Sequence, residues 1–118
     1  MSDSILTSVK QFLGITEEYT HFDSDVIMGI NTSFSILTQL GVGPRSGFAI
    51  TDSSSVWGDY PVTGPLLELV ESYVARKTKL LFDPPTSSST LEALQAVVSE
   101  LEWRMNSFAD FPEDTEGG

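Results

Sequence analysis

The chain has 118 residues, with 17 acidic and 6 basic side chains, a formal net charge of −11 and no cysteine. This length suits one domain with its own hydrophobic core, and the lack of cysteine excludes disulfides and thiolate metal sites. The excess of negative charge argues against broad electrostatic binding to DNA or to anionic membranes.

The sequence also lacks the signals of membrane insertion and secretion. Its apolar runs fall far short of the roughly 20 residues that a transmembrane helix needs. The first residues do not combine a basic segment with an apolar run, which is the pattern of a signal peptide. We therefore expect no membrane partner.

Two amphipathic helices are predicted in the first third of the chain, over residues 2–13 and about 24–40. Apolar residues recur there at spacings of three and four, which places them on one face of each helix. Ser2 or Asp3 can cap the first helix and Asp23 the second, because their side-chain oxygens accept hydrogen bonds from free backbone N–H groups.

Glycines mark the ends of these helices and one point inside them. Gly14 and Gly41 follow the helical patterns and suit the left-handed cap position, and Gly43-Pro44 prevents the second helix from continuing. Gly29 lies inside the second helix, where glycine is unfavourable by up to about 1 kcal/mol. We interpret it as a point where another helix approaches closely, in preference to a functional site.

Residues 44–65 break the helical pattern and are predicted to form a long central loop. Phe48–Thr51 can form a short strand, and Val56–Tyr60 either a 3₁₀ turn or a second strand that completes a β-hairpin. Loops of this length are usually functional or disordered, but this one carries four large side chains: Phe48, Ile50, Trp57 and Tyr60. They either anchor a contact with another protein molecule or fold back over the core of their own chain.

Two further helices are predicted over about residues 66–82 and 91–106. Pro84 and Pro85 lack backbone donors, so the third helix must end near Phe82. The Thr and Ser hydroxyls of residues 86–90 can then cap the fourth helix. We expect a tight connection between the two helices and antiparallel packing.

The apolar positions of these two helices predict where they meet. Leu80 or Tyr73 is expected on one side of the seam and Leu94 or Leu101 on the other, since the fourth helix repeats apolar residues every three and four positions. Trp103 lies off this seam, so it covers either a second surface or an interface, and we expect it to be in the core in preference to an interface. The basic residues Arg76, Lys77 and Lys79 either complement the end of the third helix dipole or form a docking patch.

The predicted fold is therefore mainly α, a small bundle of about four helices with a long central loop. We expect a helical domain over residues 1–106 and a flexible acidic tail over residues 107–118, because the tail lacks Lys and Arg and shows no helical period. Its residues are candidates for docking to a partner: Phe108, Asp110, Phe111, Glu113 and Asp114.

No pattern in the sequence indicates catalysis, a metal or a cofactor. A Gly-rich phosphate loop before a helix is absent, and so is a Gly-x-Ser-x-Gly nucleophile elbow. His21 is the single histidine, and the carboxylate pairs lie in polar segments that do not favour perturbed pKa values. We expect a protein that is not an enzyme and that binds no cofactor.

Two groups of motifs resemble head–tail connector, or adaptor, proteins of tailed bacteriophages and prophages. The first group is INT at residues 30–32, QLGVGP at 39–44 and GF at 47–48. The second is LLFDPPTSS at residues 80–88 and LEWRMN at 101–106. Together with the helix order, they extend the resemblance over about residues 5–106.

The resemblance implies a structural role at the neck of a virion that is assembled in the bacterial cytoplasm. Such proteins form a ring of typically about twelve subunits beneath the portal. The ring extends the DNA channel, lets DNA pass without sequence-specific binding, and presents a surface to the next neck, head-completion or tail protein. The family has no catalytic residues, so none are expected here.

In such a ring, Phe48, Ile50, Trp57 and Tyr60 would be candidates for the contact between subunits, and the tail residues would be candidates for the contact with the portal. Two other classes of function remain open on the sequence. An acidic DNA mimic that inhibits a DNA-binding protein would use the net charge of −11. A generic helical interaction domain would need only the apolar faces.

Overall fold

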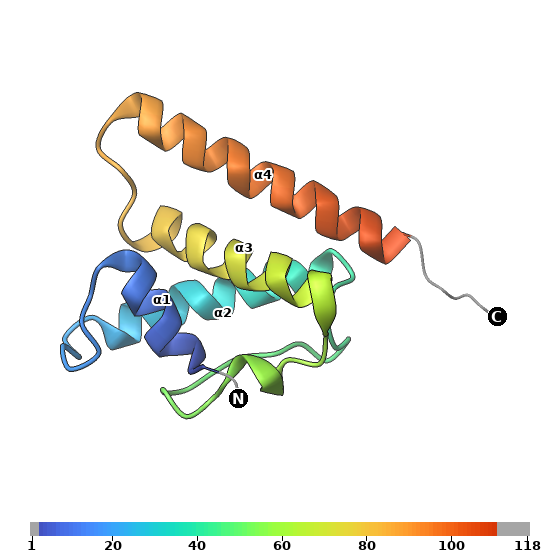
Figure 1. Cartoon of the computed structure of the whole chain (residues 1–118), viewed down its shortest axis with the longest axis horizontal. Coiled ribbons are helices and arrows are strands. Elements are labelled where there is room, and N and C mark those ends of the chain that lie inside the picture. The colour runs from blue at the N-terminus through green and yellow to red at the C-terminus, as the bar shows by residue number, and fades with distance from the viewer. Residues whose placement is uncertain (1–2, 111–118) are drawn as a thin grey trace.

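A computed structural model describes residues 3–110 as four α-helices and one short 3₁₀ helix (Figure 1). The helices are α1 (Ile5–Leu13), α2 (Asp23–Gln39), η1 (Trp57–Asp59), α3 (Gly64–Phe82) and α4 (Ser88–Asp110). The expectation of a mainly α, four-helix fold is confirmed. The helix α4 extends four residues beyond the predicted end at Asn106, so the helical part of the chain is longer than residues 1–106.

The start of α1 is capped by Ser4, not by Ser2 or Asp3. The Ser4 side chain accepts a hydrogen bond from the backbone N–H of Thr7 at 3.2 Å. Gly14 ends the helix with φ of 83°, as its position predicted, because glycine adopts the left-handed conformation without a steric penalty.

Asp23 begins α2, but its side chain does not cap the helix. It pairs with the ammonium group of Lys10 at 2.7 Å, and Lys10 also donates to the backbone carbonyls of Glu17 and Tyr19 at 3.1 and 2.7 Å. Lys10 is only 2 % exposed, and a buried ammonium group needs such oxygen partners to offset the loss of its hydration. This arrangement ties the α1–α2 connection to α1.

Gly29 permits the close packing of α2 on α3. A Cβ atom at Gly29 would lie 3.0 Å from Cγ2 of Thr78, which is tighter than ordinary van der Waals contact. The interpretation of this glycine as a helix–helix contact is confirmed.

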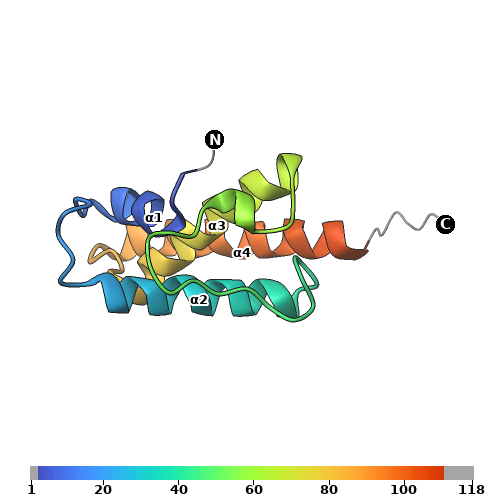
Figure 2. The same cartoon turned by 90° about the horizontal axis from the view of Figure 1, so that it is seen from below.

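The central segment folds back onto α1 and α2 (Figure 2). Within residues 3–110 it contains no strand, so the predicted β-hairpin is wrong, and the alternative of a 3₁₀ turn is what η1 forms. The backbone of Ile50 bonds to the side chain of Asn31, donating at 2.8 Å and accepting at 3.0 Å. An amide side chain on α2 thus takes the place of a partner strand.

A second set of backbone bonds joins the central segment to the start of the chain. Ile5 donates to the carbonyl of Ser55 at 3.0 Å, and Trp57 donates to that of Asp3 at 3.1 Å. These bonds form an isolated antiparallel bridge between Ser4 and Val56, and they hold η1 beside α1.

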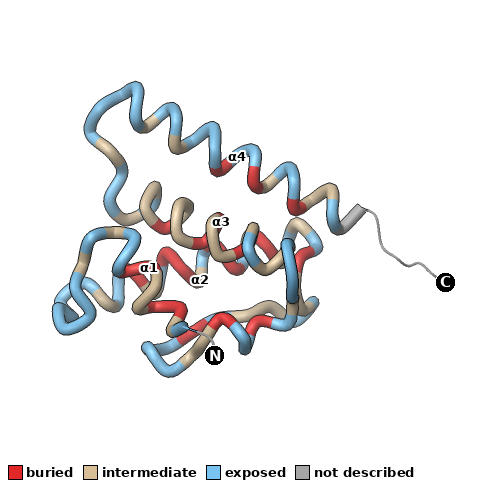
Figure 3. Tube along the Cα trace, viewed as in Figure 1, coloured by how far each residue is buried: buried red, intermediate tan, exposed pale blue. Residues whose placement is uncertain are grey.

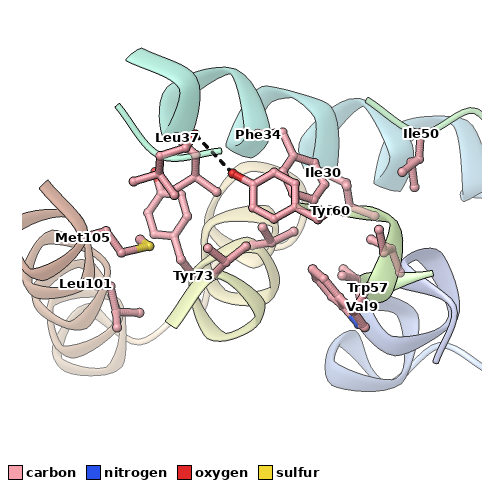
Figure 4. Packing of buried hydrophobic residues seen from close by; sticks show 14 of the residues in the cluster. Val9, Ile30, Phe34, Leu37, Ile50, Trp57, Tyr60, Tyr73, Leu101 and Met105 are labelled. Carbon is pink, nitrogen blue, oxygen red and sulfur yellow. Dashed lines mark hydrogen bonds between the residues drawn. The ribbon is translucent and has the colours of Figure 1, made fainter. Parts of the chain in front are cut away.

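The core is centred on Phe34 of α2. Its ring lies 4.9 Å from that of Phe48, 5.0 Å from that of Tyr60 and 6.4 Å from that of Trp57, measured between ring centres. Figure 4 shows side chains from α2, α3 and the central segment converging there, with Leu101 and Met105 of α4 at the edge.

The helices α3 and α4 form an antiparallel pair joined by residues 83–87 (Figure 1). Ser87 caps α4 by accepting from the N–H of Thr90 at 3.5 Å. Tyr73 donates to the carboxylate of Glu102 at 2.7 Å, and Leu101 is 8 % exposed at the seam. The expected packing of α4 on α3 is confirmed, although residues 88–97 of α4 include no fully buried residue (Figure 3).

Candidate assembly surface

The apolar residues of the central segment lie inside their own chain. Ile50 is 2 %, Trp57 5 % and Tyr60 2 % exposed, and Phe48 is half-buried against the same core. The indole N–H of Trp57 donates to the Ser8 hydroxyl at 3.2 Å. In this conformation these side chains cover the core, so a subunit contact through them would require the segment to open. That contact stays a prediction.

The predicted docking residues of the tail are only partly described. Phe108, in the last turns of α4, is 47 % exposed. The backbone of Asp110 belongs to α4, whereas Phe111, Glu113 and Asp114 lie outside the described residues. The role of these residues in docking a partner stays a prediction.

An apolar surface that the sequence did not single out surrounds Phe82, at the C-terminal end of α3. Four exposed side chains gather at its two grooves: Tyr19 (49 % exposed), Phe22 (37 %), Met28 (67 %) and Leu81 (48 %). The larger groove, of about 640 Å³, lies between Phe82 and the residues that follow α1. The smaller one, of about 340 Å³, is lined by Met28, Leu81 and Asp25 and is called the Met28 groove here.

The helix α4 also exposes large apolar side chains. Trp103 is 71 % exposed on the side opposite the seam, whereas Val97 and Phe108, which are 41 % and 47 % exposed, lie along the border of the seam. The expectation that Trp103 is in the core is wrong, because α4 packs mainly against α3 and buries the residues of that seam. A large side chain off that seam therefore points to solvent.

The charged groups of the surface are mostly arranged within single helices. Arg104 pairs with Glu100 at 2.7 Å and Lys79 pairs with Asp83 at 3.4 Å, each one helical turn apart. Arg76 lies over the ring of Phe12, 5.1 Å from its centre. Such exposed pairs contribute little to stability and are easily exchanged, so these side chains can take new partners.

Buried polar groups have structural roles. Burial raises the pKa of Tyr60 to about 12, and its hydroxyl donates to the carbonyl of Val42 at 3.3 Å. Burial, followed by the hydrogen bond to Glu102, raises the pKa of Tyr73 well above its usual range. Both phenols therefore stay neutral at ordinary pH and act as hydrogen-bond donors.

One carboxylate cluster lies beside α1. The pKa of Glu71 is raised by partial burial, with smaller contributions from Glu68 and Asp3.

Within residues 3–110, no group of three or more His, Asp or Glu side chains is arranged so that it could hold a metal ion. Nor does any helix in this range have the length and apolar character needed to cross a membrane.

Sequence reasoning missed Met28 and the exposure of Trp103 for the same reason. The helical period places both away from the apolar stripe of their own helices. That position alone does not tell whether another element of the chain covers them. The number of neighbours of each helix decides this, and it is a property of the tertiary structure.

Comparison with known proteins agrees with these observations. The sequence profile of the family described as phage connector protein matches residues 5–110, which span all four helices and the central segment. No curated protein and no solved structure matches the chain. Because the match covers nearly all of the chain, this protein belongs to the phage connector protein family.

Proposed function

We propose that the chain is a subunit of a ring beneath the portal at the capsid vertex, which extends the DNA channel and joins the capsid to the tail. The observation that carries this proposal is the family match over residues 5–110. In this role the protein is structural, sits at the virion neck and has no catalytic residue. Its partners are further copies of itself, the portal, and the next neck or tail protein.

The surface of the chain supports an assembly role. A stable monomer rarely leaves large apolar side chains in contiguous exposed groups without a binding function. Here the region around Phe82 exposes such a group, and the outer side of α4 exposes the large side chain of Trp103. A closed ring needs two different surfaces on each subunit, one for each neighbour, and the chain offers two.

The charge is also compatible with a DNA channel. The net charge is −11, and a ring of many copies multiplies it. Carboxylates facing the lumen would repel the phosphate backbone and keep DNA from binding as it slides through.

Electron microscopy of the purified protein, alone and mixed with the portal protein encoded beside it, tests the proposal. We expect closed rings, either alone or stacked on the portal. Monomeric particles in both samples would contradict the ring.

The same preparation separates the acidic DNA mimic from a connector. A DNA mimic would compete with DNA for a DNA-binding protein and would form no rings. The exposed carboxylates of the described chain are spread over α2, α3, α4 and the connecting segments, which favours the connector.

A further inference from the structure

The two most exposed apolar side chains of the described residues are Trp103 of α4, at 71 %, and Met28 of α2, at 67 %. The surfaces around these two side chains differ in shape. Trp103 projects from the surface of its helix, with the small residues Ala96, Ser99 and Ser107 one or two turns away on the same side. Met28 lines a groove of about 340 Å³ together with Leu81.

These two side chains cannot meet within one chain. Asn106, one turn after Trp103, donates to the carbonyl of Leu40 at the end of α2 at 3.3 Å. This bond places Trp103 near the C-terminal end of α2. Met28 lies 12 residues before Leu40 on that helix, which is about 18 Å at 1.5 Å per residue. Any contact between the two must therefore join two molecules.

We propose that Trp103 of one copy inserts into the Met28 groove of the next copy, as the repeating head-to-tail contact of the assembly. This inference rests on the proposed ring, and it names the two surfaces that meet. An indole ring against a thioether and a leucine side chain buries a large apolar area and adds a favourable sulfur–aromatic contact.

The charges beside the two surfaces are complementary. Arg104 follows Trp103 in the chain, and Asp25 lines the Met28 groove. Asp25 forms no ion pair within residues 3–110, and Arg104 holds only the exposed Glu100. The contact can therefore pair Arg104 of one copy with Asp25 of the next.

The chain contains no cysteine, so paired cysteine variants give a clean test. Thr32→Cys, in the lining of the Met28 groove, and Ser99→Cys, one turn before Trp103 on the same side of α4, leave both proposed contact residues in place. They are made singly and together, and each is treated with a short bismaleimide crosslinker. A crosslinker is preferred because positions beside the contact can hold their Cα atoms farther apart than the roughly 7 Å that a disulfide permits. The reaction is run on the protein alone and with the portal protein.

We expect the mixture of the two single variants to give a covalent dimer, and the double variant to give a ladder of larger products. Each single variant alone should give no covalent product. Gln39→Cys, on an exposed position of α2 two turns from Thr32, is the matched control and should react with Ser99→Cys several-fold less.

Several results would overturn the proposal. Crosslinking of a single variant with itself, or a double variant that stops at a dimer, would indicate a two-fold contact. Rings without a ladder would place the subunit contact on other surfaces and leave the proposed function intact. The absence of both rings and ladder would contradict both the proposed ring and the proposed contact of Trp103 with the Met28 groove.

Charge reversal provides a second measurement that does not use cysteine at the contact itself. Asp25→Lys or Arg104→Glu alone should lower the yield of assembled protein about two- to fivefold, which is the effect of a weak ion pair. The two changes in one chain should restore it. Melting curves of each variant show whether the monomer is intact, and a double variant no better than the single ones would contradict the ion pair.

Discussion

The body formed by α1, α2, the central segment and α3 differs from α4 in how it is held together. The body is joined by stacked aromatic rings and by polar bonds between distant residues, such as those of Asn31 with Ile50 and of Lys10 with Asp23. In contrast, α4 rests on α3 through one seam and buries Val98, Leu101 and Met105.

This difference indicates which part of the chain supplies the stability of the fold and which part is available for contacts with other molecules. The body buries the aromatic side chains of its central segment in its own core, and it exposes large apolar side chains mainly around Phe82. The helix α4 is held along one face, and within the described residues its outer side leaves Trp103 exposed to another molecule. The central loop, which the sequence offered as the assembly element, belongs to the body.

The largest expected effect is a loss of stability in the body. Trp57→Ala removes a ring that is 5 % exposed and packs near Phe34, so the free energy of unfolding should fall by about 3–5 kcal/mol. Urea unfolding followed by circular dichroism measures it. A monomer of unchanged stability with a lower ring yield would show that Trp57 serves assembly instead.

Trp57→Phe is the matched control for that change. It keeps an aromatic ring but removes the donor that bonds to Ser8 at 3.2 Å. Its effect should be clearly smaller than that of Trp57→Ala.

A smaller effect is expected at the α4 seam. Leu101 is 8 % exposed at the edge of the core, so Leu101→Ala should lower the free energy of unfolding by about 2–3 kcal/mol, the low end for core leucines. Thermal melting checks this value, with the exposed Val97→Ala as the control. An unchanged melting temperature would mean that α4 contributes nothing to the core.

Alkaline pH should lower the free energy of unfolding through Tyr60, whose pKa is raised by burial to about 12. The folded chain holds the phenol proton more tightly than the unfolded chain, where tyrosine titrates near about 10. This stabilisation is present below about pH 10 and is lost as the pH rises towards 12.

The measurement is the free energy of unfolding at about pH 9 and about pH 11, compared between the wild type and Tyr60→Phe. The wild type should lose about 1 kcal/mol more than the variant over that interval. Equal losses would show that Tyr60 does not titrate with folding.

The smallest effect on stability is expected from the tail. Deleting residues 111–118 leaves α4 whole through Asp110 and should change the free energy of unfolding by less than about 0.5 kcal/mol. If Phe111 and the tail carboxylates dock a basic surface, the deletion should weaken portal binding in a pull-down or titration. A tail with Glu113→Gln and Asp114→Asn separates charge from the aromatic anchor, and equal binding by all three proteins would rule out the docking role.

The sequence by itself determined the local features of this protein. The helices could be predicted because their apolar period, the prolines at 84 and 85 and the glycines at 14 and 29 act over a few residues. The family could be predicted because its motifs are short and contiguous, such as those at residues 80–88 and 101–106.

Only the tertiary structure decided which residues face a neighbour and which face solvent. The partner of Asp23 is Lys10, and the partner of Ile50 is Asn31, and neither pair is evident from local spacing. The burial of Trp57 and the exposure of Trp103 follow the same principle. A side chain is buried when elements distant in the sequence meet over it. The central segment meets α1 and α2, whereas within residues 3–110 no other element covers Trp103 on the outer side of α4.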